Sequence, residues 1–237
     1  MPDETGTEES SPYVDPGTDF LRNEVSATTQ EEIDEASAEL LPERLEDLAD
    51  APMPCTGDRA HLQAIHRVLF DGVFEWAGEF RTTDIDKQGT DFVPAAEVEI
   101  ALEQLFADLS AENLLRGLPR EQFIEHLAQF YARLNYIHPF REGNGRTQRL
   151  FWGQVALHAG WTVDFVGMSK TVNDQASRDA SQDLGLEPLI ALLDEVTSPA
   201  PSVEQGEADL LASVRQEQEG QSFLDWVGSH VNPDQAQ

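Results

Sequence analysis

The order of apolar and polar residues along the middle of the chain follows the period of an α-helix. Apolar side chains recur there at intervals of three and four, so they line one face of each predicted helix. Helices are expected at residues 29–50, 59–76, 98–109, 121–137 and 146–161. Within residues 121–137, one apolar stripe comprises Phe123, Ile124, Leu127, Phe130, Tyr131, Leu134 and Ile137. The pattern predicts an all-α, or mainly α, fold.

Proline and glycine mark the places where this helical pattern stops. Pro42 is expected to break the first helix, because proline lacks the N–H that a helix interior needs. Pro139 disfavours helix at His138, so the helix over residues 121–137 should end there and lead into a glycine-rich turn. Residues 81–93 instead interleave polar and apolar positions around a glycine, which predicts a small β-hairpin or extended flap.

The two ends of the chain differ from its middle. Residues 1–15 open with an acidic, proline-containing stretch and are expected to be disordered. Residues 196–237 are predicted to form an acidic tail, in which a few apolar residues leave a short helix possible. The folded domain is therefore expected to cover residues 16–195.

Composition limits the partners that the whole surface can bind. The 237 residues carry a net charge of −30, which repels nucleic acid and anionic membranes. Cys55 is the single cysteine, so neither an internal disulfide nor a cysteine-based metal site is expected. The acidic start does not resemble a secretory signal, and no apolar run is long enough to span a bilayer. We expect a soluble, cytoplasmic protein without direct nucleic-acid or membrane partners.

One segment reverses the acidic character of the chain. Residues 131–160 contain a single acid, Glu142, and four of the thirteen arginines, which gives this window a net charge of +3. The arginines are Arg133, Arg141, Arg146 and Arg149. A helix start with surface arginines would explain the charge alone, but the neighbouring residues favour an anion site.

The turn between the two predicted helices has the chemistry of a phosphate site. Gly143 and Gly145 permit close backbone approach, and the unpaired N–H groups of the following helix would face a bound anion. Arg146 and Arg149 lie three residues apart, on one helical face. Glu142 offers oxygen ligands for Mg²⁺. His138 is the side chain able to take a proton near neutral pH, so the set suits attack of a hydroxyl on a nucleotide phosphate.

Residues 138–149, HPFREGNGRTQR, resemble the Fic-domain motif HPFx(D/E)GNGRxxR at every defined position. The resemblance extends over about residues 16–195 and includes PGTDFLRNE, RVLFDGVFEWAGEFRT and KQGTDF, which are similar to the Fic entry segment, pre-flap segment and flap. It implies a helical Fic (Fido) fold with a β-hairpin flap over the active site. It also implies protein AMPylation, the transfer of AMP from ATP to a Ser, Thr or Tyr hydroxyl.

The resemblance assigns a role to each residue that matches the motif. His138 would be the general base, Phe140 a core anchor, and Glu142 the ligand of Mg²⁺. The residues expected to bind ATP are Gly143, Asn144 and Gly145 at the α- and β-phosphates and Arg146 and Arg149 at the outer phosphates. The flap residues expected to pair with the target's main chain are Lys87, Gln88, Gly89, Thr90, Asp91 and Phe92.

Two other functions remain open beside AMP transfer. The same site would suit AMP removal or transfer of another phosphate-bearing group, although the related Doc-type phosphotransferases depart from the GNGR sequence that this chain keeps. A silenced binding module is the third reading, which the intact base and metal residues disfavour. The target cannot be deduced from a flap that binds main chain; similarity to short Fic toxins suggests a type II topoisomerase subunit.

Fic proteins are inhibited by a helix with the pattern (S/T)xxxE(G/N), whose glutamate pairs with the second arginine of the motif, here Arg149. The chain has no complete copy: Ser213 and Glu217 have the spacing, but Gln218 follows. The resemblance therefore implies a toxin controlled in trans by a small helical antitoxin, docked near residues 20–50. The remaining histidines, His61, His66, His126, His158 and His230, are interpreted as core or surface residues rather than zinc ligands.

Overall fold

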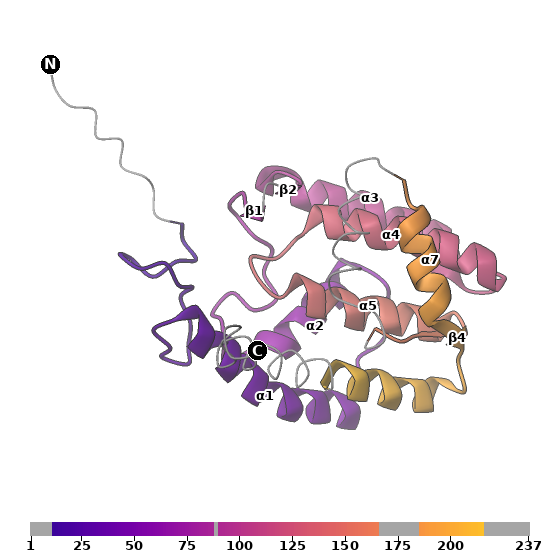
Figure 1. The fold of residues 1–237 in the computed structure, drawn as a ribbon, viewed down its shortest axis with the longest axis horizontal. Coiled ribbons are helices and arrows are strands. Elements are labelled where there is room, and N and C mark those ends of the chain that lie inside the picture. Colours follow the sequence, from indigo (N-terminus) through magenta and orange to yellow (C-terminus); the bar gives the residue numbers. More distant parts are fainter. Residues whose placement is uncertain (1–10, 88–89, 166–184, 216–237) are drawn as a thin grey trace, which may run out of the picture.

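The computed structural model describes residues 11–87, 90–165 and 185–215 and is mostly helical (Figure 1). The helices are α1 (Gln30–Asp50), α2 (Arg59–Phe70), α3 (Val98–Ala111), α4 (Arg120–Ile137), α5 (Asn144–His158) and α7 (Glu187–Val196), with 3₁₀ turns at Ala95–Glu97 and Asn113–Leu115. Residues 203–215 are also helical. The strands are β1 (Asp86–Lys87), β2 (Thr90–Asp91), β3 (Trp161–Val163) and β4 (Thr197–Pro199). The predicted mainly α fold with a small hairpin is confirmed.

Helix α5 forms the centre of the core. Every residue from Leu150 to Leu157 is buried, so this helix is covered on all sides. Helix α4 runs antiparallel to it, and the loop that joins them lies below β1 and β2 in the view of Figure 1. The whole predicted apolar stripe of α4 is buried, which confirms the helical period read from the sequence.

The expected break at Pro42 is wrong, because α1 continues through this residue from Gln30 to Asp50. An interior proline costs a helix about 3 kcal/mol. Four apolar side chains of α1 are buried, and each contributes on the order of 1.5–3 kcal/mol, so their burial outweighs that cost. The buried apolar residues are Ile33, Leu41, Leu45 and Leu48.

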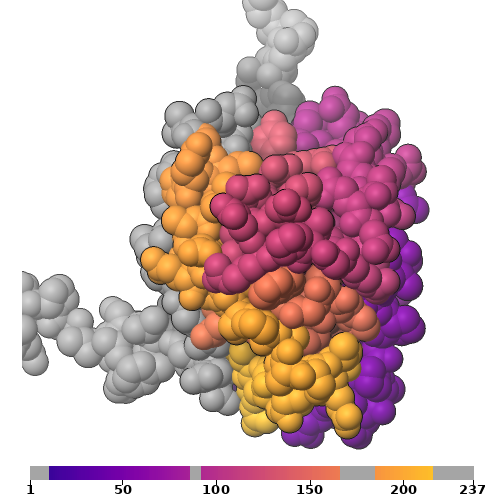
Figure 2. All heavy atoms as spheres, turned by 90° about the vertical axis from the view of Figure 1, so that its right-hand side faces the viewer, coloured from indigo at the N-terminus to yellow at the C-terminus, as the bar shows by residue number. Residues whose placement is uncertain are grey.

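The segment after α7 packs onto the core. β4 pairs antiparallel with β3, and the helical segment 203–215 then lies against α5, at the end of the molecule that Figure 2 shows in yellow. Two glycines permit the close approach: a β-carbon at Gly153 would overlap with Leu210, and one at Gly206 would overlap with Leu157. Disorder is predicted for residues 1–15: residues 1–10 lie outside the described residues, whereas Tyr13 is buried and Val14 forms a β-bridge with Leu21. Residues 216–237 of the predicted acidic tail also lie outside the described residues.

Across the described ranges, no helix combines the length and hydropathy needed to cross a membrane.

Candidate active site

The predicted arrangement of helix, turn and helix is present at the junction of α4 and α5. Helix α4 ends at Ile137, and His138 takes a left-handed backbone conformation with φ 47° and ψ 62°. Its N–H donates to the carbonyl of Leu134 at 3.0 Å, closing the helix. Left-handed backbone is unfavourable for a residue with a β-carbon, so surrounding contacts must hold His138 in place.

The imidazole of His138 is oriented by two neighbours. Its Nδ1 lies 3.2 Å from the carbonyl oxygen of Asn135, and its ring stacks on Phe92 with 4.1 Å between centroids. Because a carbonyl only accepts hydrogen bonds, this contact places the proton of the neutral ring on Nδ1. Nε2 then carries the lone pair, which is the form that a general base requires.

Gly143 shapes the start of α5. Its φ of 80° is left-handed, and a β-carbon there would overlap with the ring of Phe70, so glycine is required on both counts. Its carbonyl accepts from the Thr147 N–H at 3.1 Å and from the Thr147 hydroxyl at 2.9 Å. The first N–H groups and the positive dipole end of α5 therefore lie at this turn, as an anion site needs.

The side chain of Asn144 braces the loop. Its Oδ1 accepts from the Phe140 N–H at 2.9 Å, and its Nδ2 donates to the Phe140 carbonyl at 2.8 Å. The residue is 4% exposed, so the amide is committed to the loop, and a phosphate contact at this position would come from the backbone N–H. Phe140 itself is 1% exposed, as expected for a core anchor.

His66, predicted to be an ordinary core or surface histidine, holds this loop from α2. Its Nδ1 accepts from the Gly78 N–H at 2.8 Å, so its Nε2 carries a proton and donates to the Glu142 carbonyl at 3.0 Å. Its ring stacks on Phe140 with 3.9 Å between centroids. Burial and, to a smaller extent, the nearby charge of Arg146 lower the pKa of His66 to about 3, so the ring is neutral at pH 7.

Glu142 can hold Mg²⁺ only together with ligands from outside the protein. Its half-buried carboxylate accepts from the Gly143 N–H at 3.0 Å, at the turn where phosphates would bind. No group of three or more His, Cys, Asp or Glu side chains suited to a metal occurs among the residues described. One carboxylate still fits Mg²⁺ well, because this ion commonly keeps several waters and shares phosphate oxygens.

The two arginines of the motif have different surroundings. The Nη1 of Arg146 donates to the Ser37 hydroxyl of α1 at 2.8 Å, and its guanidinium lies 4.5 Å from the centre of the Phe70 ring. The Nη1 of Arg149 lies 3.2 Å from where a β-carbon at Gly145 would stand, so this guanidinium is next to the glycine turn. Arg149 is thus the one placed at the turn, while Arg146 is directed toward α1.

The flap is a two-stranded hairpin above the loop. β1 and β2 pair antiparallel, with Asp86 opposite Asp91 and Lys87 opposite Thr90. Gln88 and Gly89 lie outside the described residues. Phe92 follows β2 and contacts His138, so the structure joins the end of the flap to the predicted base.

Comparison with known proteins identifies the class to which this fold and site belong. The sequence profile of the Fic/DOC family matches residues 56–156. The probable protein adenylyltransferase Fic of Escherichia coli K12 is 35% identical over 181 residues, which cover 76% of this chain and 89% of that protein. The protein adenylyltransferase VbhT of Bartonella schoenbuchensis is 33% identical over 168 residues, 71% of this chain and 35% of VbhT.

Solved structures agree with the sequence comparison. The N-terminal Fic domain of a cell filamentation protein from Bartonella quintana, with bound ADP, superposes with a TM-score of 0.75 at 30% identity. The match covers 81% of this chain and 96% of that domain. The chain therefore belongs to the Fic/DOC family, as the motif predicted.

Proposed function

We propose that this Fic protein is a protein adenylyltransferase and that His138 is its general base. In this reaction the oxygen of a target Ser, Thr or Tyr hydroxyl bonds to the α-phosphorus of ATP. The bond from that phosphorus to the α–β bridging oxygen breaks, pyrophosphate leaves, and the hydroxyl proton passes to Nε2 of His138. The observation that carries the proposal is the contact from Nδ1 to the Asn135 carbonyl, because it presents Nε2 as the proton acceptor beside a phosphate-binding turn.

The opening turn of α5 would bind the nucleotide. Backbone N–H groups at Asn144 and Gly145, and that of Gly143 once it leaves the Glu142 carboxylate, would take the α- and β-phosphates, and Arg149 would take the outer phosphate. Arg146 would join it by leaving its contact with Ser37. Glu142 would hold Mg²⁺, which neutralises phosphate charge when bound. The ADP and AMPPNP bound by similar Fic domains from Bartonella support a nucleotide site.

The flap would align the target. The described strands of this short hairpin have main-chain groups at their edges, to which an extended target segment can add as a further strand. Phe92 would then connect alignment of the target to the base, since its ring is stacked on His138. Because this mode of binding recognises main-chain groups of the target, it is compatible with different acceptor side chains.

Labelled ATP distinguishes AMP transfer from phosphate transfer. The protein is incubated with Mg²⁺, a cell lysate and ATP labelled at either the α- or the γ-phosphate. We expect the α-label alone on a protein band, with AMP attached to a hydroxyl residue by mass spectrometry. A γ-label on protein would support phosphate transfer, loss of AMP from a modified protein would support the reverse reaction, and binding without label would support a silenced module.

We further propose that the protein is a cytoplasmic toxin under control in trans. The sequence lacks a complete inhibitory motif, and helix α1 lies beside Arg146, where a docked partner helix would reach the phosphate-binding arginines. A glutamate from that partner would pair with Arg149 and displace the outer phosphate. We also propose a type II topoisomerase subunit as acceptor, to be tested by incubating the purified subunit with the protein and ATP.

Growth of bacteria provides the test of control in trans. Expression of residues 1–237 alone should slow growth, and His138→Ala should relieve the effect. Inhibition would instead lie within the chain if the purified protein is inactive and deletion of residues 198–237, or replacement of Glu217, activates it.

A further inference from the structure

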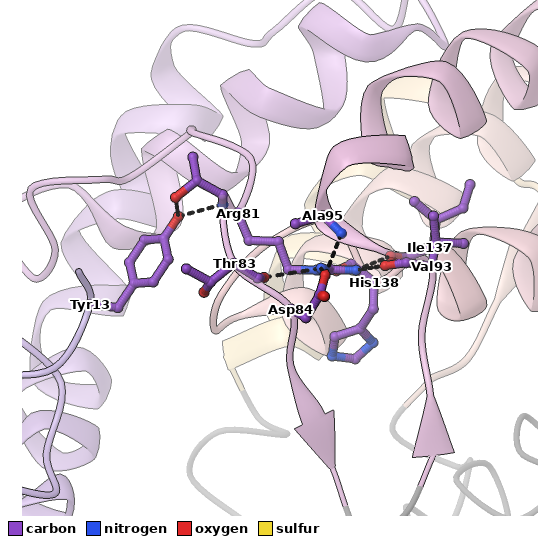
Figure 3. A network of polar contacts seen from close by, with 9 residues as sticks. Tyr13, Arg81, Thr83, Asp84, Val93, Ala95, Ile137 and His138 are labelled. Atoms are coloured by element: carbon purple, nitrogen blue, oxygen red, sulfur yellow. Dashed lines mark hydrogen bonds and ion pairs between the residues drawn. The ribbon is translucent and has the colours of Figure 1, made fainter. Parts of the chain in front are cut away.

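Arg81 carries a buried charge that has no role in the reaction proposed above. Its side chain has no exposed surface, although arginine is almost never fully buried without strong partners. It comes from the segment between α2 and the flap, and it reaches the end of α4 next to the catalytic loop (Figure 3). Strong contacts must offset the burial of this guanidinium, because removing it from water costs several kcal/mol.

The donors of Arg81 all meet main-chain carbonyls. Nε donates to the His138 carbonyl at 2.9 Å, and Nη2 donates to the Ile137 carbonyl at 3.2 Å and to that of Val93. Nη1 donates to the Thr83 carbonyl at 3.1 Å. The backbone N–H of the same residue donates to the Pro139 carbonyl at 2.9 Å. One residue thus satisfies carbonyls at three successive positions around His138.

These contacts stabilise two features at the C-terminal end of α4. The last carbonyls of a helix have no partner within the helix, and the helix C-terminus favours a cation. The left-handed backbone of His138 also needs support from outside the helix. Arg81 supplies both, while its nearest carboxylate, Asp84, lies 4.0 Å away and is 80% exposed. The carbonyls therefore stabilise the charge more than the ion pair does.

The same guanidinium holds both sides of the flap. Thr83 precedes β1 and Val93 follows β2, so Arg81 joins the two ends of the hairpin to each other. Further contacts close this base: Asp84 Oδ1 accepts from the Ala95 N–H at 2.7 Å, and the Tyr13 hydroxyl accepts from the Thr82 N–H at 2.8 Å. In Figure 3 the imidazole of His138 points between the two strands from this base.

We propose that Arg81 is a positioning residue that fixes the base His138 and the flap as one unit. It holds the backbone of His138 on one side and the backbone next to Phe92 on the other, and the rings of these two residues stack. Loss of the guanidinium fork would let the base and the aligned target move independently. This inference rests on the proposed role of His138 in AMP transfer.

Arg81→Lys tests the proposal, because lysine keeps the charge but cannot donate in four fixed directions. Arg120→Lys is the matched control: Arg120 also donates to main-chain carbonyls, at Asp194 and Thr197, but at the opposite end of α4. We expect Arg81→Lys to lower kcat about 10- to 100-fold, as misplacement of reacting groups by about 1 Å does, with the KM for ATP unchanged. Arg120→Lys should change neither.

An NMR measurement tests the positioning role of Arg81 without relying on enzymatic activity. Stacking on Phe92 shifts the ring-proton NMR signals of His138, which are identified by their loss in His138→Ala. We expect these signals to move toward unstacked values in Arg81→Lys and to stay in place in Arg120→Lys. An unchanged His138 signal in Arg81→Lys overturns the positioning role, whereas absence of AMP transfer by the native protein overturns the proposed function alone.

Asp84→Ala provides a second variant if Arg81→Lys does not fold. Its exposed side chain can be removed without opening the core, but the Ala95 N–H then loses its acceptor at the flap base. We expect a fall in kcat of about threefold, corresponding to one modest hydrogen bond, with a smaller shift of the same His138 signals. No change in either quantity would contradict the proposal.

Discussion

The loop between α4 and α5 and the flap above it are built in opposite ways. The loop is held along its length by buried side chains: His66 binds the carbonyl of Glu142, and Asn144 binds both main-chain groups of Phe140. The described contacts that attach the flap lie at its base, where Val93 N–H donates to the Tyr136 carbonyl at 3.3 Å and Asp84 accepts from Ala95. Within the described part of the flap, its two strands share two residue pairs.

This difference matches two demands of group transfer. Proton removal and phosphate binding depend on positions within about 0.5 Å, which buried and fully bonded side chains can maintain. Binding an extended segment by its main chain needs accessible N–H and C=O groups, which an edge of a short hairpin offers. We therefore expect substitutions in the loop to affect the chemical step strongly and substitutions in the flap side chains to affect it little.

The largest effect is expected for His138→Ala. General base catalysis contributes about 10²–10⁴-fold, so the single-turnover rate should fall by this factor. ATP binding should persist, because the groups proposed to bind the nucleotide belong to the turn and α5. Quenched-flow measurement with α-labelled ATP, beside an equilibrium ATP titration, gives both quantities. A variant that kept more than a tenth of the native rate would exclude His138 as the base.

Glu142→Gln should have the next largest effect. The amide keeps the size of the side chain but loses the charge that would hold Mg²⁺, and a lost electrostatic contact to a transition state costs about 10²-fold or more. Raised Mg²⁺ should restore part of the rate. Glu121→Gln, an exposed change in the first turn of α4, is the control. An unchanged Mg²⁺ dependence in Glu142→Gln would place the metal ligand elsewhere.

The contrast between loop and flap also explains what the sequence could predict. The motif residues are contiguous from His138 to Arg149, and their types and spacing carry the chemistry, so the helix–turn–helix and its candidate roles were predictable. His66 and Arg81 act on main-chain carbonyls 76 and 57 residues away, and a carbonyl leaves no signature in a sequence. The continuity of α1 through Pro42 depends likewise on burial of its apolar side chains in tertiary packing, which local helix propensity does not predict.

Acid should weaken the loop through its buried histidine. The folded pKa of His66 is lowered to about 3, below the ordinary 6.5, so its stabilisation is complete above pH 6.5 and is lost as pH falls toward 3. The expected loss is about 1.4 kcal/mol for each pH unit below 6.5. His61, whose pKa burial also lowers, adds a loss of the same sign.

His66→Gln isolates this contribution. Urea unfolding of the native protein and the variant is compared between pH 7.5 and pH 5, so that other titrating groups cancel in the difference. The variant should have a lower free energy of unfolding than the native protein at pH 7.5, and the difference between the two free energies should be smaller at pH 5. A difference in the free energy of unfolding that does not change with pH would show that His66 is not neutral in the folded loop.

The smallest effect is expected for Lys87→Ala in the flap. Lys87 pairs with Thr90 through the β ladder, and truncation of its side chain leaves the main-chain groups of β1 intact. If the target is recognised by main-chain pairing, the KM for a purified acceptor protein should change by only about twofold, the scale of a surface substitution near 0.5 kcal/mol. Thr90→Pro is the contrasting variant, because it removes an N–H from β2 and should raise the same KM by at least several-fold. If Lys87→Ala instead raised the KM tenfold while Thr90→Pro had no effect, the flap would select targets by side-chain charge. The proposal that the loop performs the chemistry and the flap recognises only the main chain of the target would then be wrong.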